Sequence, residues 1–119
     1  MKDFRTLKVW EKSHKFSLRI YSITEKFPKE ELFGITSQLR RACISIPTNI
    51  SEGCGRGSDV DFARFLQIAM GSACETEYLI LLCGDLTFIS ESTKESLLSE
   101  IQEIKKMLSV LINKLKAKC

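Results

Sequence analysis

The apolar residues in the last part of the chain recur at a spacing that is typical of one long helix. The intervals between them are 4, 3, 4, 3 and 4, over Leu97, Ile101, Ile104, Leu108, Leu111 and Leu115. This alternation puts a single apolar stripe on a helix, as in bundles and coiled coils. The helix is predicted to begin near Ser92, because Ser92 and Glu95 form a capping box. Its other faces are polar, so the stripe must be buried against neighbouring helices.

Two further segments have a clear helical period. The segment over about residues 5–27 ends at Pro28. Its predicted buried face is formed by Leu7, Trp10, His14, Ser17, Leu18 and Tyr21. The segment over residues 58–85 opens at Ser58, a suitable N-cap, with Asp59 and Asp61 in the first turn. Its predicted buried stripe is formed by Phe62, Leu66, Ala69, Ala73, Thr76, Ile80 and Cys83.

The segment over about residues 31–52 contains Pro47, which must either kink the helix or start a new helical piece. Its predicted buried side is formed by Ile35, Leu39, Ala42, Ile46 and Ile50. No stretch alternates with period two, and a chain of 119 residues has the size of one domain. The sequence therefore predicts one all-α domain over residues 1–119. We expect an antiparallel up-down four-helix bundle whose second helix is kinked or broken at Pro47.

The formal net charge is only +3, but the basic residues of the first helix gather on one side. They fall within an arc of roughly 80° and extend over roughly 30 Å of helix. The row consists of Arg5, Lys8, Lys12, Lys15, Arg19 and Lys26. Such a row is expected to contact successive phosphates of RNA or DNA, each contact adding salt-sensitive affinity. The alternative interpretation is an ordinary solvated helix face.

The residues that most catalytic and metal sites require are scarce. The chain has one histidine, His14, and five cysteines without a CxxC pair, which argues against zinc sites and most catalytic triads. Glu11 and His14 match half of a di-iron bundle site, which needs the motif twice. The glycine-rich run over 53–57 lacks Walker spacing and a preceding strand. We therefore expect no enzymatic activity, no metal and no cofactor.

The cysteines and the N-terminal residues indicate the compartment. An odd number of cysteines argues against a disulfide framework and favours a reducing environment. The first residues lack the apolar core of a signal peptide, and no run of 18 apolar residues occurs. The sequence predicts a cytoplasmic protein with no membrane partner.

Residues 78–83 are apolar on every side of the third predicted helix. A bundle helix normally keeps a polar outer face, so a helix without one is usually buried a second time. We expect Tyr78, Leu81 and Leu82 to contact another copy of the chain. The alternative is that the following loop folds over them. Small residues over 69–73 would let another backbone approach closely.

Polar residues surround Pro47. A proline inside a helix frees the carbonyl four residues earlier, which is that of Cys43. Ser45, Thr48 and Asn49 are placed where their side chains could satisfy the disturbed backbone. A kink held by local hydrogen bonds is one interpretation of this segment, and a binding notch is the other.

The residues over 38–53, QLRRACISIPTNISEG, resemble the signature of the bacterial four-helix bundle family named after 23S rRNA intervening sequences, also labelled the S23 ribosomal protein family. Further matches follow in the family's order over 7–10, 27–34 and 69–77. The resemblance implies a homopentamer of up-down bundles. It also implies kinship with the accessory protein of diversity-generating retroelements, a basic pentamer that binds nucleic acid and a reverse transcriptase. No catalytic role attaches to the matching positions, which are Arg40, Arg41, Ser45, Pro47, Asn49, Glu52, Gly53, Glu75 and Glu77.

Two functions therefore stay open on the sequence. The first is a non-enzymatic homo-oligomer that binds RNA or DNA through the basic row, together with Arg40 and Arg41. The second is a protein-interaction scaffold that displays a groove to a partner protein. In that case the basic row is solvated or docks on an acidic surface.

Overall fold

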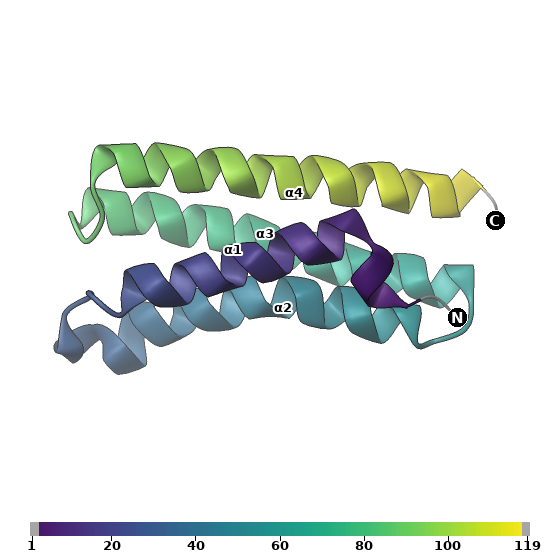
Figure 1. Cartoon of the computed structure of the whole chain (residues 1–119), viewed down its shortest axis with the longest axis horizontal. Coiled ribbons are helices and arrows are strands. Elements are labelled where there is room, and N and C mark those ends of the chain that lie inside the picture. The colour runs from purple at the N-terminus through teal and green to yellow at the C-terminus, as the bar shows by residue number, and fades with distance from the viewer. Residues whose placement is uncertain (1–2, 118–119) are drawn as a thin grey trace.

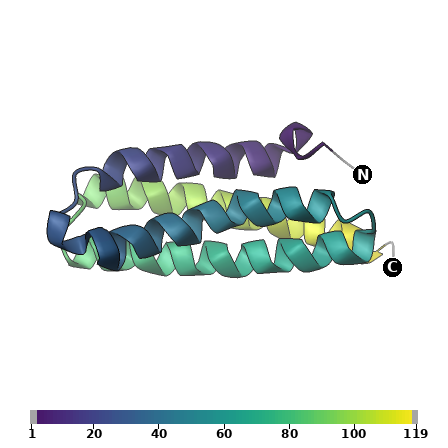
Figure 2. The ribbon, with the colours of Figure 1, turned by 90° about the horizontal axis from the view of Figure 1, so that it is seen from below.

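Long helices make up most of the computed structural model, which describes residues 3–117. They are α1 (Lys8–Thr24), α2 (Ser37–Cys54), α3 (Asp59–Asp85) and α4 (Glu91–Ala117). Consecutive helices run in opposite directions, and no strand occurs between residues 3 and 117 (Figures 1 and 2). Short 3₁₀ turns lie at Phe4–Thr6 (η1) and Lys29–Glu31 (η2), and a π-turn lies at Leu32–Thr36 (η3). The predicted antiparallel four-helix bundle is confirmed.

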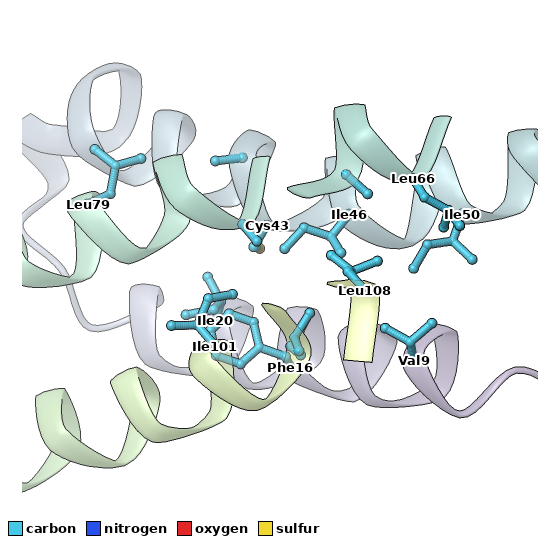
Figure 3. Close-up of a cluster of buried hydrophobic side chains, with 14 of the residues drawn as sticks. Val9, Phe16, Ile20, Cys43, Ile46, Ile50, Leu66, Leu79, Ile101 and Leu108 are labelled. Atoms are coloured by element: carbon cyan, nitrogen blue, oxygen red, sulfur yellow. The ribbon is translucent and has the colours of Figure 1, made fainter. Parts of the chain in front are cut away.

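The hydrophobic core follows the axis of the bundle. α3 packs closely against both α2 and α4, whereas α1 packs mainly against α2 and only loosely against α4. α1 and α3 therefore lie diagonally across the bundle. Figure 3 shows core side chains from all four helices, among them Ile20, Ile46, Leu66 and Ile101, each fully buried. Burial of one such side chain contributes about 2 kcal/mol to folding.

The helix starts agree with the sequence at α3 and differ at α4. The backbone N–H of Asp61 donates to the Ser58 hydroxyl at 3.2 Å, so Ser58 is the predicted N-cap. At α4 the N–H of Thr93 donates to the Ser90 hydroxyl at 3.1 Å. Ser90 is therefore the cap, and the predicted capping box at Ser92 is wrong because Ser92 already lies inside the first turn.

α2 is a single helix that continues through Pro47, so no new helix starts at this residue. The regular helix begins at Ser37, later than the predicted start near residue 31. Gly34, inside the π-turn, has φ −111° and ψ −118°, outside the helical region, so the chain is kinked at this residue. Chain direction thus changes at residues 28–36 before α2 begins.

The prediction for the buried face of the first helix is wrong. The residues of α1 that are buried are Val9, Ser13, Phe16, Ser17, Ile20 and Thr24. Of the predicted face only Ser17 is among them, while Leu18 is 59% exposed and Tyr21 is 41% exposed. α1 is thus rotated by about one residue, or roughly 100°, from the predicted orientation, so that the apolar residues Val9, Phe16 and Ile20 face the core.

Three hydroxyl side chains share this buried face with Val9, Phe16 and Ile20. The hydroxyls of Ser13, Ser17 and Thr24 donate to carbonyls of their own helix, those of Trp10, Ser13 and Ile20, at 3.0, 3.0 and 2.7 Å. A buried hydroxyl with such a partner costs little, and these small side chains let α1 approach its neighbours closely. Polarity alone therefore misidentified the inner side of α1.

The stripe on α4 is confirmed except near its end, where Leu111 is half-buried and Ile112 is buried instead. A helix with 3.6 residues per turn drifts relative to a strict heptad, so a seven-residue pattern slips by one position over this length.

The end of α3 is closed by a residue in an unfavourable conformation. The N–H of Phe88 donates to the Cys83 carbonyl and the N–H of Thr87 donates to the Gly84 carbonyl, both at 3.0 Å. This is the Schellman pattern, in which glycine is the usual C′ residue. Here Thr87 occupies that position with φ 61°. A β-branched residue is strained in the left-handed region.

We expect Thr87→Gly to raise the free energy of unfolding by about 1 kcal/mol, because glycine adopts this conformation without the steric cost of a Cβ. Urea denaturation followed by circular dichroism measures the change. Thr87→Ala is the matched control, since it keeps the Cβ and should recover much less. An equal gain in both variants would contradict this explanation.

Candidate functional site

The basic row of α1 is divided in two by the structure. In the middle of the helix the cations are paired with α4: the Lys12 ammonium lies 3.1 Å from Glu103, and the Arg19 guanidinium lies 2.8 Å from Glu100. Arg19 also donates to the Ser96 hydroxyl at 3.0 Å. These two cations join α1 to α4 across the seam where the two helices pack loosely.

Two other members of the row have acidic neighbours in their own segment. Arg5 lies 3.2 Å from Asp3, and Lys15 lies 3.8 Å from Glu11 one turn earlier. Exposed pairs of this kind add little to stability. Lys8 and Lys26 are exposed and form no ion pair with the described residues. The row is therefore not a continuous line of unpaired cations.

Lys8 instead belongs to a cluster that includes α4. It borders a groove of about 470 Å³ between the start of α1 and the last turns of α4, together with Lys106 and Lys114. The floor of the groove is apolar and is formed by Leu7, Val9, Met107, Val110 and Leu111. Sequence reasoning missed this lysine-rimmed groove, because its two sides come from opposite ends of the chain.

Arg40 and Arg41 have different environments. The Arg40 Nε donates to the Thr24 hydroxyl at 2.8 Å, and its guanidinium lies 4.5 Å from the centre of the Tyr21 ring. Arg40 therefore joins α1 to α2. Arg41 is exposed and lines a notch between α2 and α3.

The α2–α3 notch brings together several residues of the family signature. It has a volume of about 630 Å³ and is lined by Arg41, Ser45, Ser72 and Glu75 among others. The Ser72 hydroxyl donates to the Ser45 hydroxyl at 2.8 Å, and the Asn49 amide donates to the Ser45 carbonyl at 2.8 Å. Hydrogen bonds between neighbouring helices thus fix the polar floor of the notch.

The carbonyl freed by Pro47 has a partner that the sequence did not indicate. The Ser17 hydroxyl of α1 lies 3.4 Å from the Cys43 carbonyl oxygen. Thr48 and Asn49 bond to other carbonyls, those of Ile44 and Ser45. The predicted local hydrogen bonds around Pro47 therefore form, but to neighbouring carbonyls. The Cys43 carbonyl shares the Ser17 hydroxyl of α1, which also donates to the Ser13 carbonyl at 3.0 Å.

Gly53 and Glu52 have structural roles at the end of α2. A Cβ on Gly53 would lie 2.8 Å from the Phe62 ring and 2.9 Å from the Phe65 Cβ, so only glycine allows α2 and α3 to approach this closely. Glu52 lies 3.6 Å from Arg56 one turn later. Neither residue borders the notch.

Glu77 joins α3 to α4. It accepts hydrogen bonds from the Lys105 ammonium, at 2.8 Å, and from the Gln102 amide. The hydrogen bond to Glu77 raises the pKa of Lys105 above its usual range. Glu75, two residues earlier, is exposed at the notch, so the two glutamates of the signature have different environments.

The predicted contact residues of α3 are uncovered in the single chain. Tyr78 is 60% exposed and Leu81 is 41% exposed, whereas Leu82 is half-buried and packs against the core. The interpretation that the following loop covers this face is wrong, because the chain turns back at Leu86 without reaching it.

A second uncovered apolar face lies on α1 and α2 and was missed by sequence reasoning. Leu18 and Tyr21 of α1 belong to it, together with Ile44 of α2, which is 38% exposed and lines a shallow pocket with Trp10 and His14. The exposed His14 ring stacks on Trp10 at 4.9 Å on the same side. Because α1 and α3 lie diagonally across the bundle, the exposed side chains of α1 and those of α3 point away from each other.

Comparison with known proteins identifies the family of this chain. The family model described as 23S rRNA-intervening sequence protein matches residues 5–110. The chain belongs to this family. A crystal structure of a protein of unknown function from the S23 ribosomal protein family of Bacteroides thetaiotaomicron is similar, with 33% identity and a TM-score of 0.82. The match covers 88% of this chain and 95% of that one. Among curated proteins there is no match.

In this member of the 23S rRNA-intervening sequence protein family, the thiols of Cys43 and Cys83 are poor nucleophiles. Burial raises the pKa of both Cys43 and Cys83 to about 11. Between residues 3 and 117, no three His, Cys, Asp or Glu side chains are grouped in a way that would hold a metal ion. No helix in the same range is long and apolar enough to cross a membrane.

We expect Arg19→Gln to lower the free energy of unfolding by about 0.5–1 kcal/mol, because it removes a half-buried ion pair between α1 and α4. Lys15→Gln is the matched control, since its pair is long and exposed, and should have no measurable effect. A double-mutant cycle with Glu100→Gln, measured by urea denaturation, isolates the pair. Equal effects of the two variants would show that Arg19 is an ordinary surface cation.

Proposed function

We propose that this protein is a non-enzymatic, self-associating helical bundle that acts as a binding scaffold in the cytoplasm. The observation that carries the proposal is the pair of uncovered apolar faces, one on α1–α2 and one on α3. A soluble monomer rarely exposes such faces, and covering them is the usual source of stability in oligomers. The buried thiols Cys43 and Cys83 suit a reducing compartment, and burial raises the pKa of both.

Two different faces favour a ring. If the α1–α2 face of one copy packs on the α3 face of the next, the contact is heterologous, and repeated rotation closes a ring. The family resemblance implies five copies. A ring also repeats every surface of the chain around one axis, so weak contacts to a partner can add up.

We expect the purified protein to have a mass of about five times 13.5 kDa by light scattering. Tyr78→Glu combined with Leu81→Glu should give smaller species, because two charges would be buried at the contact. Leu82 is left intact because it packs against the core. Val110→Glu is the matched control, since Val110 is 55% exposed on α4, outside both faces. A parent that is monomeric would contradict self-association.

Mixing variants tests the heterologous arrangement. Leu18→Glu disables the α1–α2 face, and the Tyr78→Glu, Leu81→Glu variant disables the α3 face. Each variant alone should be monomeric, whereas an equal mixture should form a one-to-one heterodimer through the single intact pair of faces. A mixture that stays monomeric would exclude this pairing of faces.

Nucleic-acid binding is the second candidate function, and it is favoured by Lys8, Lys106 and Lys114, which form no ion pair within residues 3–117. α4 carries no Asp or Glu after Glu103, so every charged side chain in its last turns is a lysine. Phosphate contacts from such a cluster would be repeated in every subunit of a ring. The candidate surface thus moves from the predicted row on α1 to the α1–α4 end of the bundle.

We expect the affinity for a labelled structured RNA to fall steeply with salt if this second function holds. Lys8→Glu with Lys114→Glu should weaken binding and lower the slope of log affinity against log salt by about 2. Lys26→Glu with Lys29→Glu makes the same charge change at the other end of the bundle and is the control. No binding at low salt would leave the scaffold function alone.

A further inference from the structure

We infer that the groove between α1 and α4 is a docking site for an acidic amphipathic helix of a partner protein. The inference rests on the proposed scaffold function and names the kind of partner that this surface fits. Neither the α1–α2 face nor the α3 face takes part, so the groove is expected to stay open in the ring.

The floor of the groove has the shape and chemistry that a helix requires. α1 is ten residues shorter than α4, with 17 residues against 27, and α4 continues past the start of α1 (Figure 1). Met107, Val110 and Leu111 follow one another at helical spacing along this uncovered part, and Leu7 closes the floor from the side of α1. Val110 is 55% exposed. An apolar strip between two helices accepts the apolar face of a third helix.

The rim of the groove determines the charge of the occupant. Lys8 stands on the α1 side, and Lys106 and Lys114 stand on the α4 side. No carboxylate side chain lines this groove in the described part of the chain. Like charges that face each other across a groove repel, and a partner with carboxylates beside its apolar stripe would relieve that repulsion.

The other half of the same seam shows how the chain satisfies such cations when it closes a contact by itself. There Lys12 meets Glu103 and Arg19 meets Glu100, so both cations have a carboxylate on α4. In the groove that Lys8 borders, the charged residues of α4 are lysines instead. The open half of the seam therefore lacks the carboxylates that the closed half has, and the partner is expected to supply them.

A synthetic peptide tests the inference without knowledge of the natural partner. The probe is a fluorescein-labelled helix of about 20 residues, with leucines at every third or fourth position and glutamates on both sides of that stripe. A peptide of the same composition in shuffled order is the control probe. The fluorescence anisotropy of each labelled peptide is measured as the full-length protein is added. The affinity for the amphipathic peptide should be at least about tenfold higher than that for the shuffled peptide.

Two protein variants separate the floor from the rim. Val110→Gln keeps the charge and should weaken peptide binding at least about fivefold, because it replaces the exposed apolar part of the floor. Lys8→Glu with Lys114→Glu should abolish binding, while Lys26→Glu with Lys29→Glu should leave it unchanged. Equal binding of the two peptides, or no effect of Val110→Gln, would overturn the inference.

Competition with single-stranded RNA gives the remaining outcome. If RNA binds through the same lysines, with a steep salt dependence and no response to Val110→Gln, while the amphipathic peptide binds no better than the shuffled one, the groove is a nucleic-acid surface. Light scattering of each variant is measured in parallel. If the protein is monomeric and binds the peptide, docking in the groove is supported and self-association is contradicted. If the protein is assembled and does not bind the peptide, self-association is supported and docking in the groove is contradicted.

Discussion

The packing of the hydroxyl-bearing side of α1 into the bundle determines which surfaces the protein exposes. Ser13, Ser17 and Thr24 return their hydroxyls to carbonyls of their own helix and can therefore be buried. Ser17 also reaches the Cys43 carbonyl that Pro47 leaves without a backbone partner, so the irregularity in α2 and the orientation of α1 are linked. Because α1 is held in this rotation, Val9, Phe16 and Ile20 are buried, and Leu18 and Tyr21 remain at the surface. Burial of these side chains against another chain would then stabilise the contact between the two chains.

The same rotation divides the seam between α1 and α4. In the middle of the bundle the cations of α1 reach glutamates of α4, and these pairs hold two helices that otherwise pack loosely. Near the start of α1 the seam opens over an apolar floor with lysines on both sides. Paired and unpaired cations thus lie on one helix within a few turns of each other. Only the paired cations help to hold the bundle together, so the lysines around the groove remain available to a partner.

Most of the signature that identifies the family is explained by packing between helices rather than by chemistry. Gly53 allows the close contact of α2 with α3, Glu77 holds Lys105 of α4, and Ser45 bonds to Ser72 across the notch. Arg41 and Glu75 are the exceptions, since both are exposed at the notch. The signature therefore specifies the arrangement of α2 and α3 in detail, and that is why it predicts the fold much better than it predicts a function.

The sequence by itself determined that the chain is an all-α bundle, because the 3-4 spacing on α4, the stripe on α3 and the cap at Ser58 are local patterns with one structural solution. It also located the uncovered residues of α3, since a helix that is apolar on every side is visible without knowledge of its neighbours. The choice between two apolar sides of α1 was made only by the tertiary structure: Val9, Phe16 and Ile20 mark one side, and Leu7, Leu18 and Tyr21 mark another. Buried hydroxyls with local partners do not settle it, because they are indistinguishable from exposed ones in a sequence. The lysine-rimmed groove likewise exists only in the folded chain. Its two sides come from opposite ends of the sequence, and no periodicity relates Lys8 to Lys114 until α1 and α4 lie side by side.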